Sequence, residues 1–556
     1  MLASVAGTGD GRPRWRFPES AVWCAAALVL AGLQLPLQRS PCLSDDSFQY
    51  LSVAKLLRST HQLATPLVHF DTERSHGTIP APLTWFPPGY PAAIALVSTT
   101  GLSCEHAALL ISIASFVLVT GGLWRLTRAL NPSRWVARAA VLGWLANSHA
   151  LQYSVSACSE LLFTVLGLGS VLFLVQADET GDGERRNGLR RLGSAILAGA
   201  SYWVRYAGIL WALSCLALLW AQFAAARSKR RATLPFAIAA STSVLLLLAP
   251  VMIRNVILVG DWRGGNNTPA SMSISVFVRE SIKLAYHLIL GSASVRQLWL
   301  PTALMSIGLL GLCVTTFRAW GATHVPPVRR APGALVPVLG TAAIYIAGIA
   351  MIAMHSVISY APRMFVPVLP HLLALGACGI ATLARRIPAR IQPRTYPAML
   401  ACVLLGYVSG NVISRISLGP DQYAKTQRAL LAPDEAGRSI RRLLDEELKP
   451  GDVIAATNGQ AAGYILNHPA LSLVGRPYGT VAWNAPELRA ALTRYGAAWL
   501  LVFRDAELDP VVGESPLLAG LAAGRGPPWL DLAGSNGRVY VYKVRLPGTP
   551  DATGGR

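Results

Sequence analysis

Long apolar stretches recur along this chain between residues 21 and 414, separated by short polar segments. A run of roughly 17–25 apolar residues matches the length of a helix that spans the hydrocarbon core of a bilayer. We therefore predict an α-helical polytopic membrane protein with about eleven transmembrane helices. The expected spans are 21–38, 106–124, 137–153, 160–176, 192–204, 206–222, 234–252, 299–317, 334–353, 365–383 and 397–414.

The composition excludes an ordinary soluble enzyme and a disordered chain. Hydrophobic residues make up 53% of the sequence and charged residues only 14%, against about 25% charged residues in soluble domains. The net charge of +21 raises the question of nucleic-acid binding, which needs basic residues gathered on one soluble face. Here they lie between apolar runs, so we expect no nucleic-acid partner and attribute the charge to membrane topology.

The distribution of basic residues predicts the orientation of the chain. Six alternate gaps between the spans hold 22 Arg and Lys residues against six acidic ones. By the positive-inside rule these gaps face the cytoplasm, which makes 1–20 a cytoplasmic N-terminus. We expect a multi-pass protein of the cell (inner or plasma) membrane, with a transmembrane module over 21–414. The first span is interpreted as an uncleaved anchor rather than a signal peptide, because no clear cleavage site precedes Pro41.

The segment 415–556 has the composition of a soluble domain. Runs typical of strands occur at 452–456, 498–503 and 538–544. Helical patterns at 434–448 and 486–495 alternate with them. This alternation predicts an extracytoplasmic α/β domain at the C-terminus.

No pattern in the sequence indicates a metal site. The ten His are scattered, and no Cys/His cluster has metal-ligand spacing. No cofactor is therefore predicted with certainty, and a divalent metal stays possible. Cys42, Cys104 and Cys158 lie on or near the expected outer side, where one disulfide and free thiols are equally compatible with the sequence.

Two adjacent carboxylates, Asp45 and Asp46, follow the first span in the outer loop 39–105. An amphipathic helix is expected directly after them, because apolar residues recur there at helical spacing. Its apolar stripe is formed by Phe48, Leu51, Ala54 and Leu57. In a purely structural reading, Ser44 or Asp45 caps this helix. A functional reading is compatible with it, since a helix N-terminus also orients a carboxylate.

Charged side chains recur at the outer ends of later spans. Arginine binds phosphate through a planar fork that is always charged, so several of them at one membrane level suit an anionic head group. Ionisable residues this close to hydrocarbon tend to mark function, although any single Arg there is commonly a snorkelling side chain. The residues at this level are Glu160, Arg205, Arg254, His355, Tyr360 and Arg363.

Taken together, these motifs resemble the GT-C superfamily of polyprenyl-phosphate-sugar glycosyltransferases. The bacterial branch that holds the aminoarabinose transferase of lipid A and the protein O-mannosyltransferases (glycosyltransferase family 39-type) is the most similar. The likeness covers roughly residues 20–385. It rests on Ser44-Asp45-Asp46 with Tyr50, Phe86-Pro87-Pro88-Gly89-Tyr90-Pro91, Ser159-Glu160, Arg205-Tyr206-Ala207-Gly208, Arg254-Asn255 with Gly260, and Arg363 with Pro367 and Pro370.

The resemblance implies an inverting transferase at the outer face of the membrane. A sugar would move from a polyprenyl-phosphate donor to a hydroxyl of a cell-envelope lipid, glycan or protein. By resemblance Asp45 is the catalytic base. The family pattern is usually Asp-Glu, so the role of Asp46 stays open between orienting Asp45, holding a metal and touching the acceptor.

The remaining site residues are expected around the donor. A phosphate leaves as a stabilised anion, so it needs positive charge rather than a proton donor. The candidates for donor binding are Arg205, Arg254, Arg363, Lys55 and Tyr360, with Arg363 first among them. Glu160 is expected to pair with one of these arginines, and Tyr50, Tyr90 and His355 are expected to support the site.

Three other functions stay open at this point. A transporter or flippase would place charges near the bilayer midplane, often on repeated halves, whereas here they gather at one face. A non-catalytic envelope scaffold could retain the same fold. A ligase with a lipid-diphosphate oligosaccharide donor would offer the same kind of anionic head group to the arginines.

Overall fold

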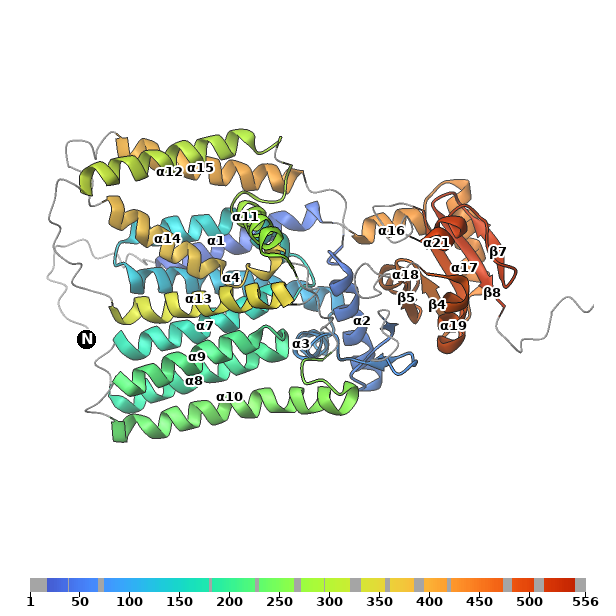
Figure 1. Cartoon of the computed structure of the whole chain (residues 1–556), viewed down its shortest axis with the longest axis horizontal. Coiled ribbons are helices and arrows are strands. Elements are labelled where there is room, and N and C mark those ends of the chain that lie inside the picture. Colours follow the sequence, from blue (N-terminus) through green and yellow to red (C-terminus); the bar gives the residue numbers. More distant parts are fainter. Residues whose placement is uncertain are drawn as a thin grey trace, which may run out of the picture.

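The computed structural model shows a helical bundle with a smaller unit beyond one of its ends. Long helices lie side by side, α2 and α3 lie across one end of them, and the C-terminal elements follow outside that end (Figure 1). The structure describes residues 18–38, 40–68, 75–179, 183–225, 230–264, 272–294, 296–320, 332–355, 361–384, 395–417, 422–473, 483–504 and 515–545.

Every predicted span contains a helix of the bundle. The helices are α1 Glu19–Gln34, α4 Cys104–Leu130, α5 Arg134–Ala146, α7 Glu160–Glu179, α8 Glu184–Val204, α9 Gly208–Ala225, α10 Arg230–Val259, α12 Trp299–Trp320, α13 Pro332–His355, α14 Leu369–Ala384 and α15 Thr395–Ile416. The span expected over 137–153 is wrong as a single helix. It breaks at Asn147, whose side chain accepts a hydrogen bond from the Ala150 amide and starts a separate helix α6, Ser148–Ser154.

Six helices in the described ranges are long and apolar enough to cross a membrane, and the chain is a membrane protein. They are Glu19–Leu37, Cys104–Leu130, Glu160–Ala177, Thr233–Val259, Gly333–His355 and Ala398–Ile416. Four apolar helices are shorter, at Gly89–Ser98, Gly208–Ala224, Trp299–Leu310 and Leu369–Leu383. Eleven crossings and the inside–outside orientation therefore stay predictions.

The bundle buries one face of its helices and exposes apolar side chains on the other. Helix α8 contacts α7, α9 and α10, while α4 contacts α1, α5 and α7. On α10, Leu245, Leu246 and Ile257 are more than 60% exposed. Contiguous apolar surface of this kind on a soluble protein would be a binding patch or an aggregation hazard. On a membrane helix it is the face that contacts lipid.

The C-terminal unit, defined here as the described residues between 422 and 545, is built around a six-stranded mixed sheet with strand order β2-β5-β4-β6-β8-β7. Its own strands are β4 Val453–Ala456, β5 Ala470–Ser472, β6 Ala497–Phe503, β7 Leu530–Ser535 and β8 Val539–Val544. Strands β2, β5, β4 and β6 run parallel, and β8 and β7 are antiparallel. The helices are α16 Gln422–Leu430, α17 Glu435–Glu447, α18 Gly459–Leu466, α19 Ala485–Tyr495 and α21 Pro516–Leu521.

Three of these strands and two of these helices lie where the sequence patterns predict them. The run 498–503 is apolar throughout because β6 is buried on both faces: Leu500 and Val502 join one core cluster, and Leu501 and Phe503 the other. The edge strand β2, Leu67–Val68, was not predicted. It comes from the first outer loop and pairs in parallel with β5.

The outer loop that carries the two carboxylates folds into α2 Asp45–Thr60, the short strands β1 Ala64–Thr65 and β3 Ala81–Pro82, and α3 Gly89–Ser98. The expected amphipathic helix is present. Of its apolar stripe, Phe48, Leu51 and Ala54 are fully buried. Ser44 occupies the N-cap position, one of the two expected, but its side chain accepts no capping hydrogen bond there, and Asp45 is the first residue of the helix.

Two further elements complete the end of the bundle near the outer loop. Helix α11, Ile274–Leu290, contacts the short helix η3, Pro362–Met364, which precedes α14.

Among the cysteines in the described ranges, Cys42, Cys104 and Cys158 are all buried free thiols, so the structure contains no disulfide among these three.

Candidate active site

The first turn of α2 meets η3 at the end of the bundle. A nitrogen of Arg363, Nη1, donates a hydrogen bond to Oδ2 of Asp46 at 2.7 Å. The Asp46 carboxylate raises the pKa of the Arg363 guanidinium, which therefore stays charged. Asp45 precedes Asp46 at the N-terminus of the helix, so a carboxylate and a cation from distant parts of the sequence lie beside it.

A second ion pair lies next to the first. Arg205 follows the last residue of α8, and its Nη1 donates to Glu160 Oε1 at 2.8 Å and to Ser159 Oγ at 2.9 Å. Its Nη2 contacts the sulfur of Met364, the neighbour of Arg363, at 3.6 Å. Burial lowers the pKa of the Arg205 guanidinium, but the Glu160 carboxylate outweighs it and the pKa is raised overall.

Tyr50 connects α2 to this second pair. Its hydroxyl lies 3.1 Å from Ser159 Oγ, the atom that also accepts from Arg205. Tyr50 is one helical turn after Asp46, so both side chains project from the same face of α2. The two ion pairs are thereby joined through Tyr50 and Ser159 into one cluster.

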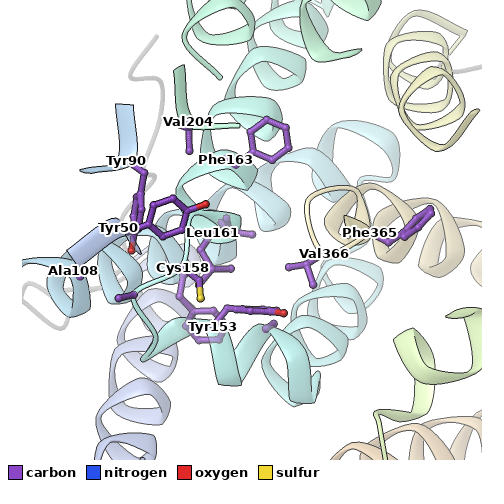
Figure 2. Packing of buried hydrophobic residues seen from close by; sticks show 14 of the residues in the cluster. Tyr50, Tyr90, Ala108, Tyr153, Cys158, Leu161, Phe163, Val204, Phe365 and Val366 are labelled. Atoms are coloured by element: carbon purple, nitrogen blue, oxygen red, sulfur yellow. The ribbon is translucent and has the colours of Figure 1, made fainter. Parts of the chain in front are cut away.

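Aromatic side chains form a wall beside the cluster. The Tyr50 ring lies 4.9 Å from the Phe86 ring and 5.0 Å from the Tyr90 ring, between centroids. Figure 2 shows Tyr50 and Tyr90 next to each other, and Tyr153 and Cys158 belong to the same cluster of buried hydrophobic residues. The Tyr50 and Tyr90 rings are buried and Phe86 is partly buried, and together they form the side of the site that the Phe86–Pro91 motif supplies.

A glycine allows that motif to approach the end of α8. Gly89 begins α3, and a Cβ atom placed on it would lie 2.5 Å from the carbonyl oxygen of Trp203, two residues before Arg205. Any larger residue would therefore push α3 away from the turn that carries Arg205. The motif positions the site through this contact as well as through its rings.

Arg254 does not join the cluster. Its guanidinium donates to the carbonyl oxygen of Leu83 at 2.6 Å and, more weakly, to that of Leu63 at 3.5 Å. These carbonyls flank the antiparallel pair of β1 and β3 in the outer loop. The next residue, Asn255, donates to Tyr206 Oη at 3.0 Å. These hydrogen bonds of Arg254 are thus with the loop backbone, and they do not support its expected place at the donor phosphate.

Lys55 also points elsewhere. Its ammonium lies 2.7 Å from Oε1 of Glu105 and 4.3 Å from the centre of the Tyr464 ring. Two and a half turns of α2 separate Lys55 from Asp46. Its partners are thus α4 and the C-terminal unit rather than the arginine cluster.

The last two site residues predicted from the sequence have no described contact with the arginine cluster. His355 is the exposed final residue of α13. Tyr360 lies outside the described residues. The described ranges also contain no group of three His, Cys, Asp or Glu residues that could hold a metal ion.

Two contact residues were not singled out as site residues from the sequence. Ser159 accepts from Arg205 and contacts Tyr50, and Met364 contacts Arg205. Ser159 lies in a motif that the resemblance already contained, so its place beside Glu160 was an available signal. Met364 carries no such signal, because its role depends on the approach of η3 to the end of α8.

The chain has the GT-C glycosyltransferase fold. ArnT from Cupriavidus metallidurans, solved with undecaprenyl phosphate bound, matches with a TM-score of 0.55 and 14% identity, over 95% of this chain and 99% of that one. The Archaeoglobus fulgidus oligosaccharyltransferase, solved with zinc and sulfate, matches with a TM-score of 0.56 and 13% identity, over 94% and 73%. At these identities the likeness establishes the fold alone. No protein-family model and no curated protein sequence matches the chain.

Proposed function

We propose that this protein is an inverting glycosyltransferase that moves a sugar from a polyprenyl-phosphate donor to a hydroxyl of a cell-envelope acceptor. The observation that carries the proposal is the pairing of Arg363 with Asp46 at 2.7 Å, one residue from Asp45. It brings a permanent cation to a carboxylate pair at one end of a membrane bundle. A similar fold in ArnT holds undecaprenyl phosphate.

In the proposed reaction Asp45 acts as the general base. Its carboxylate takes the proton of the acceptor hydroxyl while that oxygen forms a bond to the anomeric carbon. The bond between the anomeric carbon and the phosphate oxygen breaks, and its electron pair leaves with the polyprenyl phosphate. One displacement on the face opposite the phosphate inverts the anomeric centre, and no proton donor is required for the leaving group.

The arginines stabilise the charge that develops on the departing phosphate. A guanidinium has five N–H donors, and the contact with Asp46 uses Nη1 of Arg363. Arg205 is held by Glu160 and Ser159 at 2.8 and 2.9 Å, so its charge is fixed in place before the donor arrives. Such preorganised charge is most effective in a site with little water. In this proposal Asp46 orients Arg363 rather than serving as a second base.

The test is the release of undecaprenyl phosphate from a set of undecaprenyl-phosphate sugars by the purified protein with an envelope extract as acceptor. Replacing Asp45 by Asn keeps the shape and removes the base, so we expect release to fall by about a hundred- to ten-thousandfold. Asp445→Asn on the exposed face of α17 is the matched control and should leave release unchanged. Wild-type-like release by Asp45→Asn would remove Asp45 from the base role.

A further inference from the structure

The far end of α2 is held by a cluster of three polar side chains from three separate parts of the fold. Lys55 of α2 lies 2.7 Å from Oε1 of Glu105, which belongs to α4. The hydroxyl of Tyr464, from α18 of the C-terminal unit, donates to the same Glu105 oxygen. The Lys55 ammonium also lies over the Tyr464 ring, 4.3 Å from its centre. One carboxylate oxygen therefore connects α2, the bundle and the C-terminal unit.

An apolar contact supports this polar cluster. The ring of Phe48, which is fully buried in α2, lies 5.4 Å from the Tyr464 ring. The Cys42 thiol, in the segment before α2, is fully buried. The side chain of Tyr464 is among the groups that influence the pKa of this thiol. Tyr464 therefore covers both the entry to α2 and its buried face.

A second, independent connection runs through the backbone of the outer loop. Gln49 of α2 donates to the carbonyl oxygen of Leu67 at 2.6 Å and accepts from the Thr65 hydroxyl at 2.7 Å. Leu67 belongs to β2, which pairs with Ala470 of β5 in the sheet of the C-terminal unit. Gln49 is one helical turn after Asp45. The sheet thus reaches the carboxylate end of α2, and Tyr464 contacts the helix from Phe48 to Lys55.

From these contacts we propose that the C-terminal unit clamps α2 in the position that presents Asp45 to the acceptor, and that Tyr464 is the positioning residue of this clamp. The proposal rests on the proposed transferase function for its effect on turnover. Its effect on α2 itself can be measured without any transfer. Arg205 is held by Glu160 of α7, whereas Arg363 pairs with Asp46 on α2 itself. Because one of the two donor arginines does not depend on α2, the clamp should influence the base more than donor binding.

The test compares full-length wild type with Tyr464→Phe, which keeps the ring and removes the hydroxyl. Losing one hydrogen bond to a charged acceptor should speed amide exchange across Asp45–Thr60 about tenfold. Alkylation of Cys42 should accelerate with it, because the segment before α2 opens more often when α2 is held less firmly. Tyr540→Phe, in β8 at a half-buried position of the same unit, is the matched control and should change neither rate.

Measuring turnover shows whether the contact of the C-terminal unit with α2 positions Asp45 for the reaction or only holds the two parts of the fold together. In the undecaprenyl phosphate release assay, Tyr464→Phe should lower kcat by roughly three- to tenfold, with a smaller change in KM for the donor. Gln49→Leu, which removes the second connection, should produce the same pattern. Faster exchange with an unchanged kcat would overturn the positioning role. Unchanged exchange and unchanged Cys42 alkylation in Tyr464→Phe would overturn the clamp itself.

The two proposals fail in different ways. If wild type releases no undecaprenyl phosphate from any donor, the transferase function is contradicted, and the exchange of α2 still decides whether the clamp exists. If wild type is active and Tyr464→Phe matches it in exchange, alkylation and kcat, the clamp is contradicted and the transferase function stands.

Discussion

The buried pair of Arg205 and Glu160 gives a prediction whose size follows from the structure. Glu160 is only 3% exposed and Arg205 15%, and their charged atoms lie 2.8 Å apart. Replacing Arg205 by Met keeps most of the side-chain volume and removes the charge. Glu160 then stays buried at the end of α7 without its cation. Removing one partner of such a buried pair costs about 3–5 kcal/mol, because an uncompensated charge is left behind.

A double substitution shows whether that cost comes from Glu160. In Arg205→Met/Glu160→Gln the buried charge is gone, so most of the lost stability should return. The matched control is Arg134→Met. Arg134 is 71% exposed and its nearest contact with Glu19 is 3.9 Å long, so its removal should cost about 1 kcal/mol or less.

The assay is the fraction of protein that stays monodisperse in detergent after heating, followed by size-exclusion chromatography across a temperature series. We expect the order wild type and Arg134→Met, then the double variant, then Arg205→Met as the least stable. The double variant should still fail to release undecaprenyl phosphate, because the donor site has lost a cation. A single variant as stable as wild type, or a double variant no better than the single one, would refute the reasoning.

Two other predictions concern the outer loop. Arg254→Met should leave the carbonyls of Leu63 and Leu83 without their charged donor and cost about 1–3 kcal/mol, which faster amide exchange at 61–68 and 75–84 would reveal; unchanged exchange there would contradict the anchoring role. Burial raises the pKa of the Cys42 thiol to about 12, so at pH 8 only about one molecule in ten thousand carries the reactive thiolate. Alkylation of Cys42 in the folded protein should be about a thousandfold slower than in protein unfolded in SDS and should rise with pH, and equal rates in the two states would contradict the buried position.

Hydrophobic length was the strongest signal in the sequence, and it located a helix in each of the eleven predicted runs. It could not place the break at Asn147, because hydropathy is averaged over a window of about 19 residues, in which one polar residue has little weight. The break depends on a side-chain cap that forms only in the folded chain. Short runs typical of strands likewise located β4, β6 and β8, yet β2 is only two residues long and pairs with a strand some 400 positions away in the sequence.

The candidate site was predicted in part. The carboxylates and the two arginines of the cluster stand in local motifs, but which arginine meets which carboxylate is a tertiary fact. Arg254 and Lys55 illustrate the difficulty, since a cation near the end of a span suits a phosphate, a backbone carbonyl or a nearby glutamate equally well. In the structure Arg254 donates hydrogen bonds to the loop carbonyls, and Lys55 forms an ion pair with Glu105.

The central claim is that this protein takes its sugar from a polyprenyl-phosphate donor, and mass spectrometry of the lipids that copurify with it tests that claim most directly. Wild type, Asp45→Asn and Arg363→Met would be purified side by side. We predict polyprenyl phosphate or its sugar conjugate on wild type, enrichment of the sugar-loaded lipid on Asp45→Asn, and loss of both from Arg363→Met. Absence of any polyprenyl lipid from all three proteins, or equal amounts on wild type and Arg363→Met, would contradict the account.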